Sequence, residues 1–314
     1  MESKNNWKAW LYLAPVIILT AVFTFYPIIN TVGISFLKNY NSLQHTYDGF
    51  TFDNYLEILM IKPFRSTVVG DVFITDFIQV ALPNTLLITF ITVPISIFLA
   101  LAIAIALNSI KILKKLFQTI FFMPYVTNAI AIGMVFSVIF DNNGIVNYIF
   151  NTDVHWLYAG SGANPNYWAA LFALSVYIIW HSLPYKILIF LGGLQNIDNQ
   201  YYDAAKIDGS SMMKIIRRVT IPLLSPQILY VMITSFIGAF KEYTSVVAIF
   251  GVGGGSFDGT TGPTSMKTVA FYIYDQMSST TTLQYAAAAA VILLIIILIF
   301  TAVQKVVAKR RVHY

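Results

Sequence analysis

The sequence has 314 residues, of which 57% are hydrophobic and only 11% are charged, and its formal net charge is +5. A soluble domain carries about 25% charged residues, so this composition indicates an integral membrane protein. The chain has no cysteine, which excludes disulfides, thiol catalysis and thiolate metal sites, and its four histidines show no metal-ligand spacing.

Six segments are apolar enough to span a membrane, since a spanning helix needs about 20 mostly apolar residues. In chain order they are 9–30, 81–107, 118–140, 168–193, 222–250 and 284–306. The first is too long for a signal peptide, contains Pro15 and Pro27, and lacks a small-residue cleavage site, so we expect it to be retained. The sequence therefore predicts an all-α integral membrane protein with a single domain over residues 1–314.

The basic residues predict the orientation of these spans. Thirteen of the 19 lysines and arginines lie in the amino terminus, the 108–117 loop, the 194–221 loop and the carboxyl-terminal tail. They are Lys4, Lys8, Lys111, Lys114, Lys115, Lys206, Lys214, Arg217, Arg218, Lys305, Lys309, Arg310 and Arg311. Because basic loops stay in the cytosol, both termini and these two loops are predicted to be cytoplasmic. The positive charge is thereby explained by orientation, and we expect no nucleic-acid partner.

A polar, charged stretch lies between the fourth and fifth spans, over residues 198–226. Asp198 is placed to cap a helix over 199–208, and Gly209 is placed to end it by adopting a positive φ. Ser210 is expected to cap a second helix, and Pro222 to open a third. In the second helix one apolar face is predicted, made of Met212, Ile215, Ile216 and Val219. The pattern alone also fits an amphipathic helix that rests on lipid head groups.

The motif Asp203-Ala204-Ala205-x-x-Asp208-Gly209, followed by Ile221-Pro222-x-x-x-Pro226, resembles a family signature. It is similar to the "EAA" coupling loop of the permease subunits of ABC importers. Three positions depart from the family pattern, since Asp203 replaces the usual glutamate, Ser210 the usual alanine, and Asp198 a proline that the family often has. The preceding run 192–197, Gly-Gly-Leu-Gln-Asn-Ile, resembles the carbohydrate-uptake branch of these permeases.

The resemblance implies the permease fold of a type I ABC importer, with six spans and the 198–221 loop contacting an ATPase in the cytosol. Its ATPase-coupling residues would be Asp203, Ala204, Ala205, Asp208 and Gly209. The implied partners are a second permease in a heterodimer, two ATP-binding subunits, an extracytoplasmic solute-binding protein and the lipid of a bacterial inner membrane. This chain would not be an enzyme, and it contains no P-loop motif, so ATP is expected to bind only to the partner subunits.

Few ionisable residues interrupt the predicted spans. Lys186 lies in the inner part of span four, and Lys241 and Glu242 interrupt span five. Charges at membrane depth usually face a cavity or a partner. Glu242 with Tyr243 is our preferred candidate for the substrate pathway, because a carboxylate accepts from sugar hydroxyls and a ring stacks on a sugar face. Pairing with a partner subunit is the alternative for Glu242, and Asn128 is a weaker pathway candidate.

The expected cargo is a sugar or oligosaccharide. A glycerol-phosphate-type or other solute is an alternative, but a phosphate would require converging lysine and arginine side chains, and the spans contain few. This favours a neutral sugar. An ion-coupled secondary transporter is a further alternative, although the two halves of the chain show no clear repeat.

Overall fold

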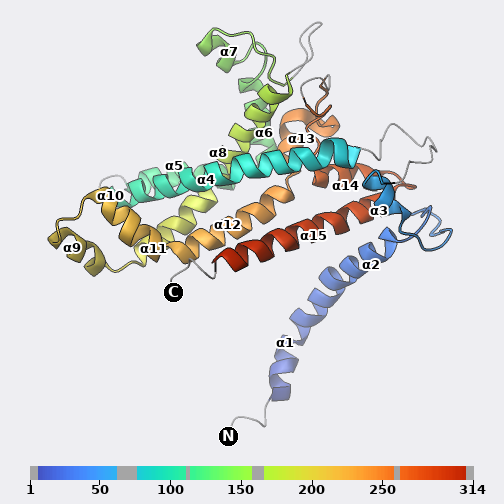
Figure 1. Cartoon of the computed structure of the whole chain (residues 1–314), viewed down its shortest axis with the longest axis horizontal. Coiled ribbons are helices and arrows are strands. Elements are labelled where there is room, and N and C mark those ends of the chain that lie inside the picture. Colours follow the sequence, from blue (N-terminus) through green and yellow to red (C-terminus); the bar gives the residue numbers. More distant parts are fainter. Residues whose placement is uncertain (1–5, 62–75, 111–113, 158–165, 258–261, 309–314) are drawn as a thin grey trace. The chain divides into compact units, whose positions relative to one another are not determined.

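The structure, a computed structural model, describes residues 6–61, 76–110, 114–157, 166–257 and 262–308 (Figure 1). Within these ranges every regular element is a helix, and the only strand-like pairings are two isolated β-bridges. The all-α prediction is therefore confirmed. The basic residues Lys4, Lys111, Lys309, Arg310 and Arg311 lie outside the described residues.

The chain separates into two compact units. One comprises Met1–Ile78 and Tyr272–Ile295, and the other comprises Gln79–Phe271 and Ile296–Tyr314. The single domain over 1–314 stays a prediction.

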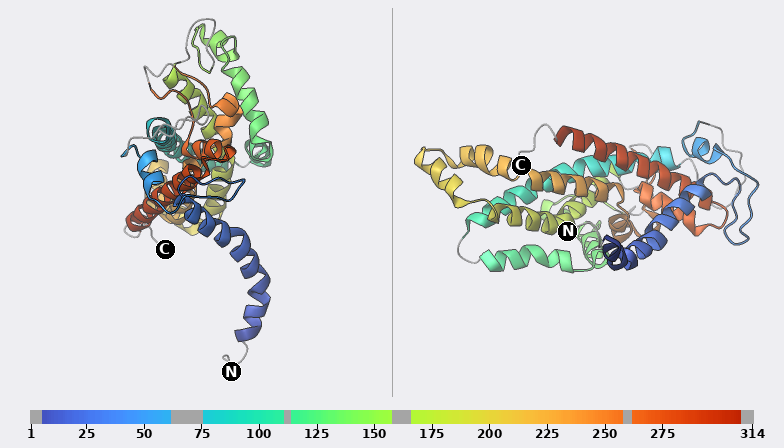
Figure 2. Two further views of the ribbon diagram at one scale, coloured as in Figure 1. Left: turned by 90° about the vertical axis from the view of Figure 1, so that its right-hand side faces the viewer. Right: turned by 90° about the horizontal axis from the view of Figure 1, so that it is seen from below.

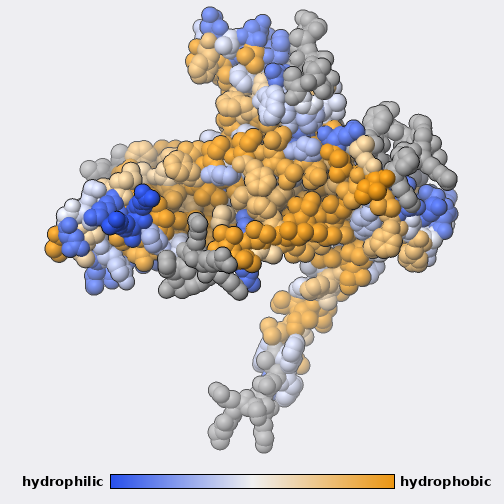
Figure 3. All heavy atoms as spheres, in the orientation of Figure 1, coloured by the Kyte–Doolittle hydropathy of each residue, from blue (hydrophilic) through white to orange (hydrophobic). Residues whose placement is uncertain are grey.

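Four helices in the described ranges are long and apolar enough to cross a membrane. They are Trp10–Ser35, Phe77–Ser109, Tyr167–Gln195 and Leu283–Ala308. Two further pairs, Leu116–Val126 with Ala129–Ile139 and Met212–Leu223 with Ser225–Phe240, are bent by 99° and 68°. The count reaches six only if each bent pair forms one span, so the number six stays a prediction. Figure 3 shows hydrophobic residues over much of the visible helical surface, whereas hydrophilic residues gather at the end that carries α9 and α10.

The first unit contains the amino-terminal helices and a packed loop. Its elements are α1 (Asn6–Thr20), a π-helical turn (Ala21–Phe25), α2 (Tyr26–Ser35) and α3 (Asp53–Ile58), with parts of α14 (Val269–Ser278) and α15 (Leu283–Ala308). Asn54 is buried and donates to the carbonyls of Ser35 and Leu37 at 2.8 and 2.9 Å. Tyr285 of α15 donates to Glu57 of α3 at 2.6 Å. These bonds hold the loop after α2 against the carboxyl-terminal helices.

The second unit is built around α4 and α8. Its elements are α4 (Leu82–Ser109), α5 (Lys114–Val126), α6 (Ala129–Ile139), α7 (Ile145–Phe150), α8 (Tyr167–Gln195), α9 (Asn199–Ile207), α10 (Met212–Ile215), α11 (Ile221–Leu223), α12 (Ser225–Phe240) and α13 (Thr244–Phe250). Small buried residues of α4, Ala100 and Ala104, pack with Ile187 and Phe190 of α8. Small residues let helix backbones approach closely in lipid, which explains this tight pair.

Three π-helical turns interrupt the helices of the described chain, and each precedes a proline. They are Ala21–Phe25 before Pro27, Phe77–Ala81 before Pro83, and Ile216–Thr220 before Pro222. The proline ring clashes with the carbonyl four residues earlier, which is the middle residue of each wide turn. The prolines thus widen the helix locally and do not end it.

A buried asparagine links α4 to the segment that precedes α14. Asn84, which is fully buried, donates to the carbonyls of Ser265 and Lys267 at 2.7 and 2.9 Å and accepts from the Tyr167 hydroxyl at 2.7 Å. If the Asn84 amide is removed, the two carbonyls and the Tyr167 hydroxyl all lose this hydrogen-bond partner. Asn84 is therefore a structural centre of this unit.

We expect Asn84→Ala to destabilise the protein by about 2–4 kcal/mol, because unsatisfied buried polar groups cost about 1–3 kcal/mol each. The measurement is thermal unfolding of the purified protein in detergent, followed by size-exclusion chromatography. Gln195→Ala, which removes an exposed amide, is the matched control. Equal unfolding temperatures for the two variants would show that the Asn84 bonds do not hold this unit together.

Candidate functional site

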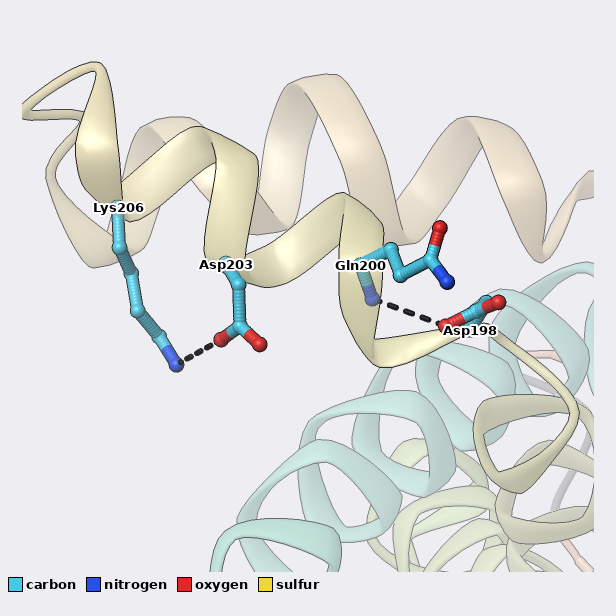
Figure 4. A network of polar contacts seen from close by, with 4 residues as sticks. All are labelled: Asp198, Gln200, Asp203 and Lys206. Atoms are coloured by element: carbon cyan, nitrogen blue, oxygen red, sulfur yellow. Dashed lines mark hydrogen bonds and ion pairs between the residues drawn. The ribbon is translucent and has the colours of Figure 1, made fainter.

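The 198–221 loop forms two helical arms joined by a glycine turn. The Asp198 side chain accepts from the Gln200 backbone N–H at 2.9 Å and so caps α9, as predicted (Figure 4). Gly209 adopts φ +69° after the end of α9, which also confirms the prediction. Figure 1 and the right-hand view of Figure 2 place α9 and α10 beyond the ends of α8 and α12.

The predicted role of Ser210 is wrong. Its N–H donates to the Ala205 carbonyl at 3.0 Å, while the Gly209 N–H donates to the Lys206 carbonyl at 2.9 Å. These two bonds form the Schellman motif that closes the carboxyl end of α9. Ser210 therefore belongs to the end of the first arm, and Ser211 takes the N-cap position of α10 without a side-chain cap bond.

The predicted apolar face of the second arm is only partly formed. Ile215 is buried and Ile216 and Val219 are half-buried, but Met212 is 61% exposed. Met212 lies in the first turn, before the wide turn at 216–220 changes the helical phase.

The residues that the motif nominates for coupling are available at the surface of this chain. Asp203, Ala204, Asp208 and Gly209 are exposed and Ala205 is half-buried. Asp203 makes an exposed ion pair with Lys206 at 3.1 Å, on one side of α9 (Figure 4). The loop also exposes apolar side chains, among them Ile207 at 88%. Such a surface can dock another protein, although its apolar residues also fit a lipid surface.

A cavity of about 400 Å³ lies between α4, α5, α8 and α12. Nine of its 13 lining residues have polar side chains. The polar lining residues are Thr92, Tyr125, His181, Ser182, Tyr185, Lys186, Thr234, Ser235 and Glu242. Hydroxyls, one ammonium and one carboxylate thus converge on a space that suits a small polar molecule.

Of the three predicted pathway residues, only Glu242 lines this cavity. Tyr243 packs its ring 5.4 Å from that of Phe271, and Asn128 caps α6 by accepting from the N–H groups of Ile130 and Ala131. The carboxylate of Glu242 has a structural role too, because it accepts from the Ser245 N–H at 3.0 Å.

The cap at Asn128, whose side-chain oxygen accepts two backbone N–H groups, explains why the predicted span 118–140 is not one straight helix. Residues 127 and 128 leave the helix, the Asn128 side chain starts α6, and the two pieces meet at 99°.

The predicted span 222–250 also breaks, at two places. Leu224 separates α11 from α12, and residues 241–243 separate α12 from α13. The second break is stabilised within the chain by two hydrogen bonds. The Thr268 hydroxyl donates to the backbone carbonyl of Glu242, and the Ser245 N–H donates to the Glu242 carboxylate. The predicted span 222–250 is therefore not one continuous helix.

Sequence reasoning missed a cluster of three tyrosines, of which Tyr125 and Tyr185 line the cavity and Tyr230 contacts Tyr185. The rings of Tyr125 and Tyr185 stack with centroids 6.1 Å apart, and the hydroxyls of Tyr185 and Tyr230 lie 3.1 Å apart. The three residues come from α5, α8 and α12. No spacing in the sequence could have indicated that they meet.

Comparison with known proteins places these features in a family. Residues 93–313 match the model described as "Binding-protein-dependent transport system inner membrane component". The lactose transport system permease protein LacF of Rhizobium radiobacter is 31% identical, with 85% of this chain and 82% of the relative covered. The arabinooligosaccharides permease protein AraP of Halalkalibacterium halodurans is 32% identical, with 74% and 68% covered.

A trehalose/maltose permease protein, MalF of Thermococcus litoralis, is 25% identical over 85% of this chain and 83% of the relative. Among solved structures, a chain of a bacterial ABC transporter that imports alginate superposes with a TM-score of 0.72. It is 18% identical, and the superposition covers 98% of this chain and 96% of that one. The likeness to this solved structure supports the fold of the chain.

Proposed function

Because this chain belongs to the family of binding-protein-dependent transport system inner membrane components, it is a multi-pass permease subunit of an ABC transporter, and we propose that it passes a sugar or oligosaccharide through its cavity. The observation that carries this proposal is the polar lining contributed by four helices. Hydroxyls and a carboxylate exchange hydrogen bonds with sugar hydroxyls, and the rings of Tyr125 and Tyr185 offer apolar faces for a sugar ring. The relatives named for lactose, arabinooligosaccharides and trehalose/maltose support the same class of cargo.

We further propose the partners that this activity requires. A second permease would complete the pathway as a heterodimer, two ATP-binding subunits would hold the ATP, and an extracytoplasmic solute-binding protein would deliver the cargo. The family description and a related fold solved with a periplasmic binding protein support the last of these. Both termini and the 198–221 loop would face the cytosol of a bacterial cell, in agreement with the basic residues of these segments.

We propose that movement of the 198–221 loop is transmitted to the cavity through the continuous chain segment that joins them. The segment from Gly209 runs through α10, the wide turn at 216–220 and α11 into α12, whose last turn holds the cavity residue Ala239, and Glu242 follows in the break after α12. A movement imposed on the 198–221 loop therefore reaches the cavity along one stretch of chain. The residues that contact the ATPase would be Asp203, Ala204, Ala205, Asp208 and Gly209.

Reconstitution tests this function. The chain is placed in proteoliposomes with its sister permease, with or without the ATPase and the binding protein, and uptake of labelled lactose, maltose and arabinotriose is measured. We expect uptake only with ATP and all partners. Uptake driven by an ion gradient in the isolated chain would instead establish a secondary transporter.

We expect Glu242→Gln to reduce sugar uptake by about tenfold, equivalent to about 1.4 kcal/mol, because the charged acceptor in the cavity is lost. The glutamine keeps a carbonyl that can accept from the Ser245 N–H, so α13 stays capped. Uptake kinetics and thermal stability are measured side by side. Unchanged uptake in a stable Glu242→Gln protein would remove this residue from the pathway and leave it only its capping role.

A further inference from the structure

We propose that Lys186 forms an anion-binding subsite in the cavity, and that the sugar accepted there carries one singly charged acidic group, a carboxylate or a sulfonate. This inference rests on the proposed function and specifies its substrate class. It replaces the prediction of a neutral sugar. That prediction was based on the small number of basic residues in the spans and not on their positions.

Lys186 is a buried cation within a membrane-spanning helix. It lies on α8, its exposed fraction is 5%, and it lines the cavity. Burying an ammonium in a low-dielectric interior costs several kcal/mol unless a counter-charge or good hydrogen bonds compensate it, so intramembrane charges usually mark functional positions.

Two hydroxyls hold the amine, and both are arranged as acceptors. Lys186 Nζ donates to Ser96 Oγ of α4 at 2.5 Å and to Ser182 Oγ of α8 at 3.1 Å. Each hydroxyl donates its own hydrogen to a backbone carbonyl, Ser96 to Val93 and Ser182 to Ile179, both at 3.0 Å. Their lone pairs are thus directed to the lysine. An ammonium has three N–H donors, so one remains for a further acceptor.

Among the described residues, no carboxylate forms an ion pair with this ammonium. No described carboxylate lies within 4.0 Å of Lys186 Nζ, and the acid of the cavity, Glu242, instead accepts from the Ser245 N–H. Two neutral hydroxyls orient the ammonium but do not neutralise it. The missing elements are therefore an acceptor and a negative charge, and the cavity is the space from which a ligand can supply both.

The rest of the cavity defines what this anion is attached to. Glu242, Thr234 and Ser235 provide partners for hydroxyl groups, and the Tyr125 and Tyr185 rings provide apolar faces. A single ammonium matches a single negative charge, whereas a phosphate would call for several converging cationic donors. An acidic sugar satisfies both parts of the lining.

The test is binding to the assembled complex of this chain, its sister permease and the ATPases, in phosphatidylcholine nanodiscs without the binding protein. The probes are two matched pairs, glucuronate with glucose and cellobiouronate with cellobiose, in which the acidic sugar has a carboxylate in place of one hydroxymethyl group. We expect the acidic member of a pair to bind about tenfold more tightly, and this preference to weaken at high salt. Lys186→Gln should bring the ratio of the two affinities to about one, and Lys186→Arg should retain part of the preference.

Lys241→Gln is the matched control, since it removes an exposed lysine beside Glu242 that does not line the cavity, and it should leave the preference intact. The proposal is overturned if the wild type shows no acidic preference, or if Lys186→Gln keeps it. Loss of the preference when phosphatidylglycerol is added would assign the lysine to a lipid headgroup and would also overturn it. Failure of the complex to bind or transport any sugar would overturn the proposed function itself, whereas binding of neutral sugars alone would overturn only this inference.

Discussion

Gly209→Val is expected to abolish ATP-driven sugar uptake. Gly209 adopts φ +69°, a left-handed conformation that costs an ordinary L-residue about 1–2 kcal/mol and a β-branched residue more. The turn it forms sets the angle between α9 and α10. Within this chain a Cβ at Gly209 would meet no atom within 4 Å, so steric effects beyond the backbone must come from a docked partner.

A graded series separates these two causes. Asparagine tolerates the left-handed conformation better than alanine, and valine adds bulk at Cβ. If backbone strain is the main cause, uptake should fall in the order Gly209→Asn, Gly209→Ala, Gly209→Val. If docking dominates, Asn and Val should be equally inactive. Gly253→Val is the control, because Gly253 has equally open surroundings without a positive φ. Normal uptake and ATPase stimulation in Gly209→Val would refute the assigned role of this turn.

Asp203→Asn is expected to uncouple ATP hydrolysis from transport, with hydrolysis continuing while uptake falls by about tenfold or more. Inside this chain the Asp203 carboxylate has one ionic partner in the described residues, Lys206, and both side chains are about two-thirds exposed. Exposed pairs of this kind contribute about 0–1 kcal/mol, so losing the pair cannot explain a large effect. The effect must arise where the carboxylate meets the ATPase.

Lys206→Ala distinguishes the two roles, because it breaks the same ion pair and leaves the carboxylate. It should retain coupled transport, measured as sugar molecules imported per ATP hydrolysed. A Lys206→Ala protein as uncoupled as Asp203→Asn would show that the ion pair within α9 is what matters. Coupled turnover at the normal ratio in Asp203→Asn would contradict the role of the carboxylate.

Local rules predicted the features that depend on neighbouring residues. The cap at Asp198 and the positive φ at Gly209 follow from a few consecutive residue types, and both are present. The prediction that Ser210 caps the second helix is wrong for a related reason. A serine after a helix-ending glycine can either close the first helix through its N–H or start the next through its side chain, and only the backbone path decides between them.

Longer-range features were beyond the sequence pattern. Hydropathy counts apolar residues but does not register that Asn128 caps a new helix or that Thr268 stabilises the break after Phe240. The cavity shows the same limit. Glu242 was found because a carboxylate in a span is unusual, whereas Tyr125 and Tyr185 look like ordinary interfacial aromatics until α5 and α8 bring them together.

The segment from Gly209 to Glu242 has a thermodynamic consequence. Because one continuous stretch carries both the loop proposed to meet the ATPase and a wall of the cavity, the two events are linked equilibria. Linkage is reciprocal, so whatever factor nucleotide-driven closure applies to cargo affinity, bound cargo must apply to the closure equilibrium. If closure raises the affinity for cargo, bound cargo favours closure by the same factor, and a transporter with an empty cavity hydrolyses less ATP without import.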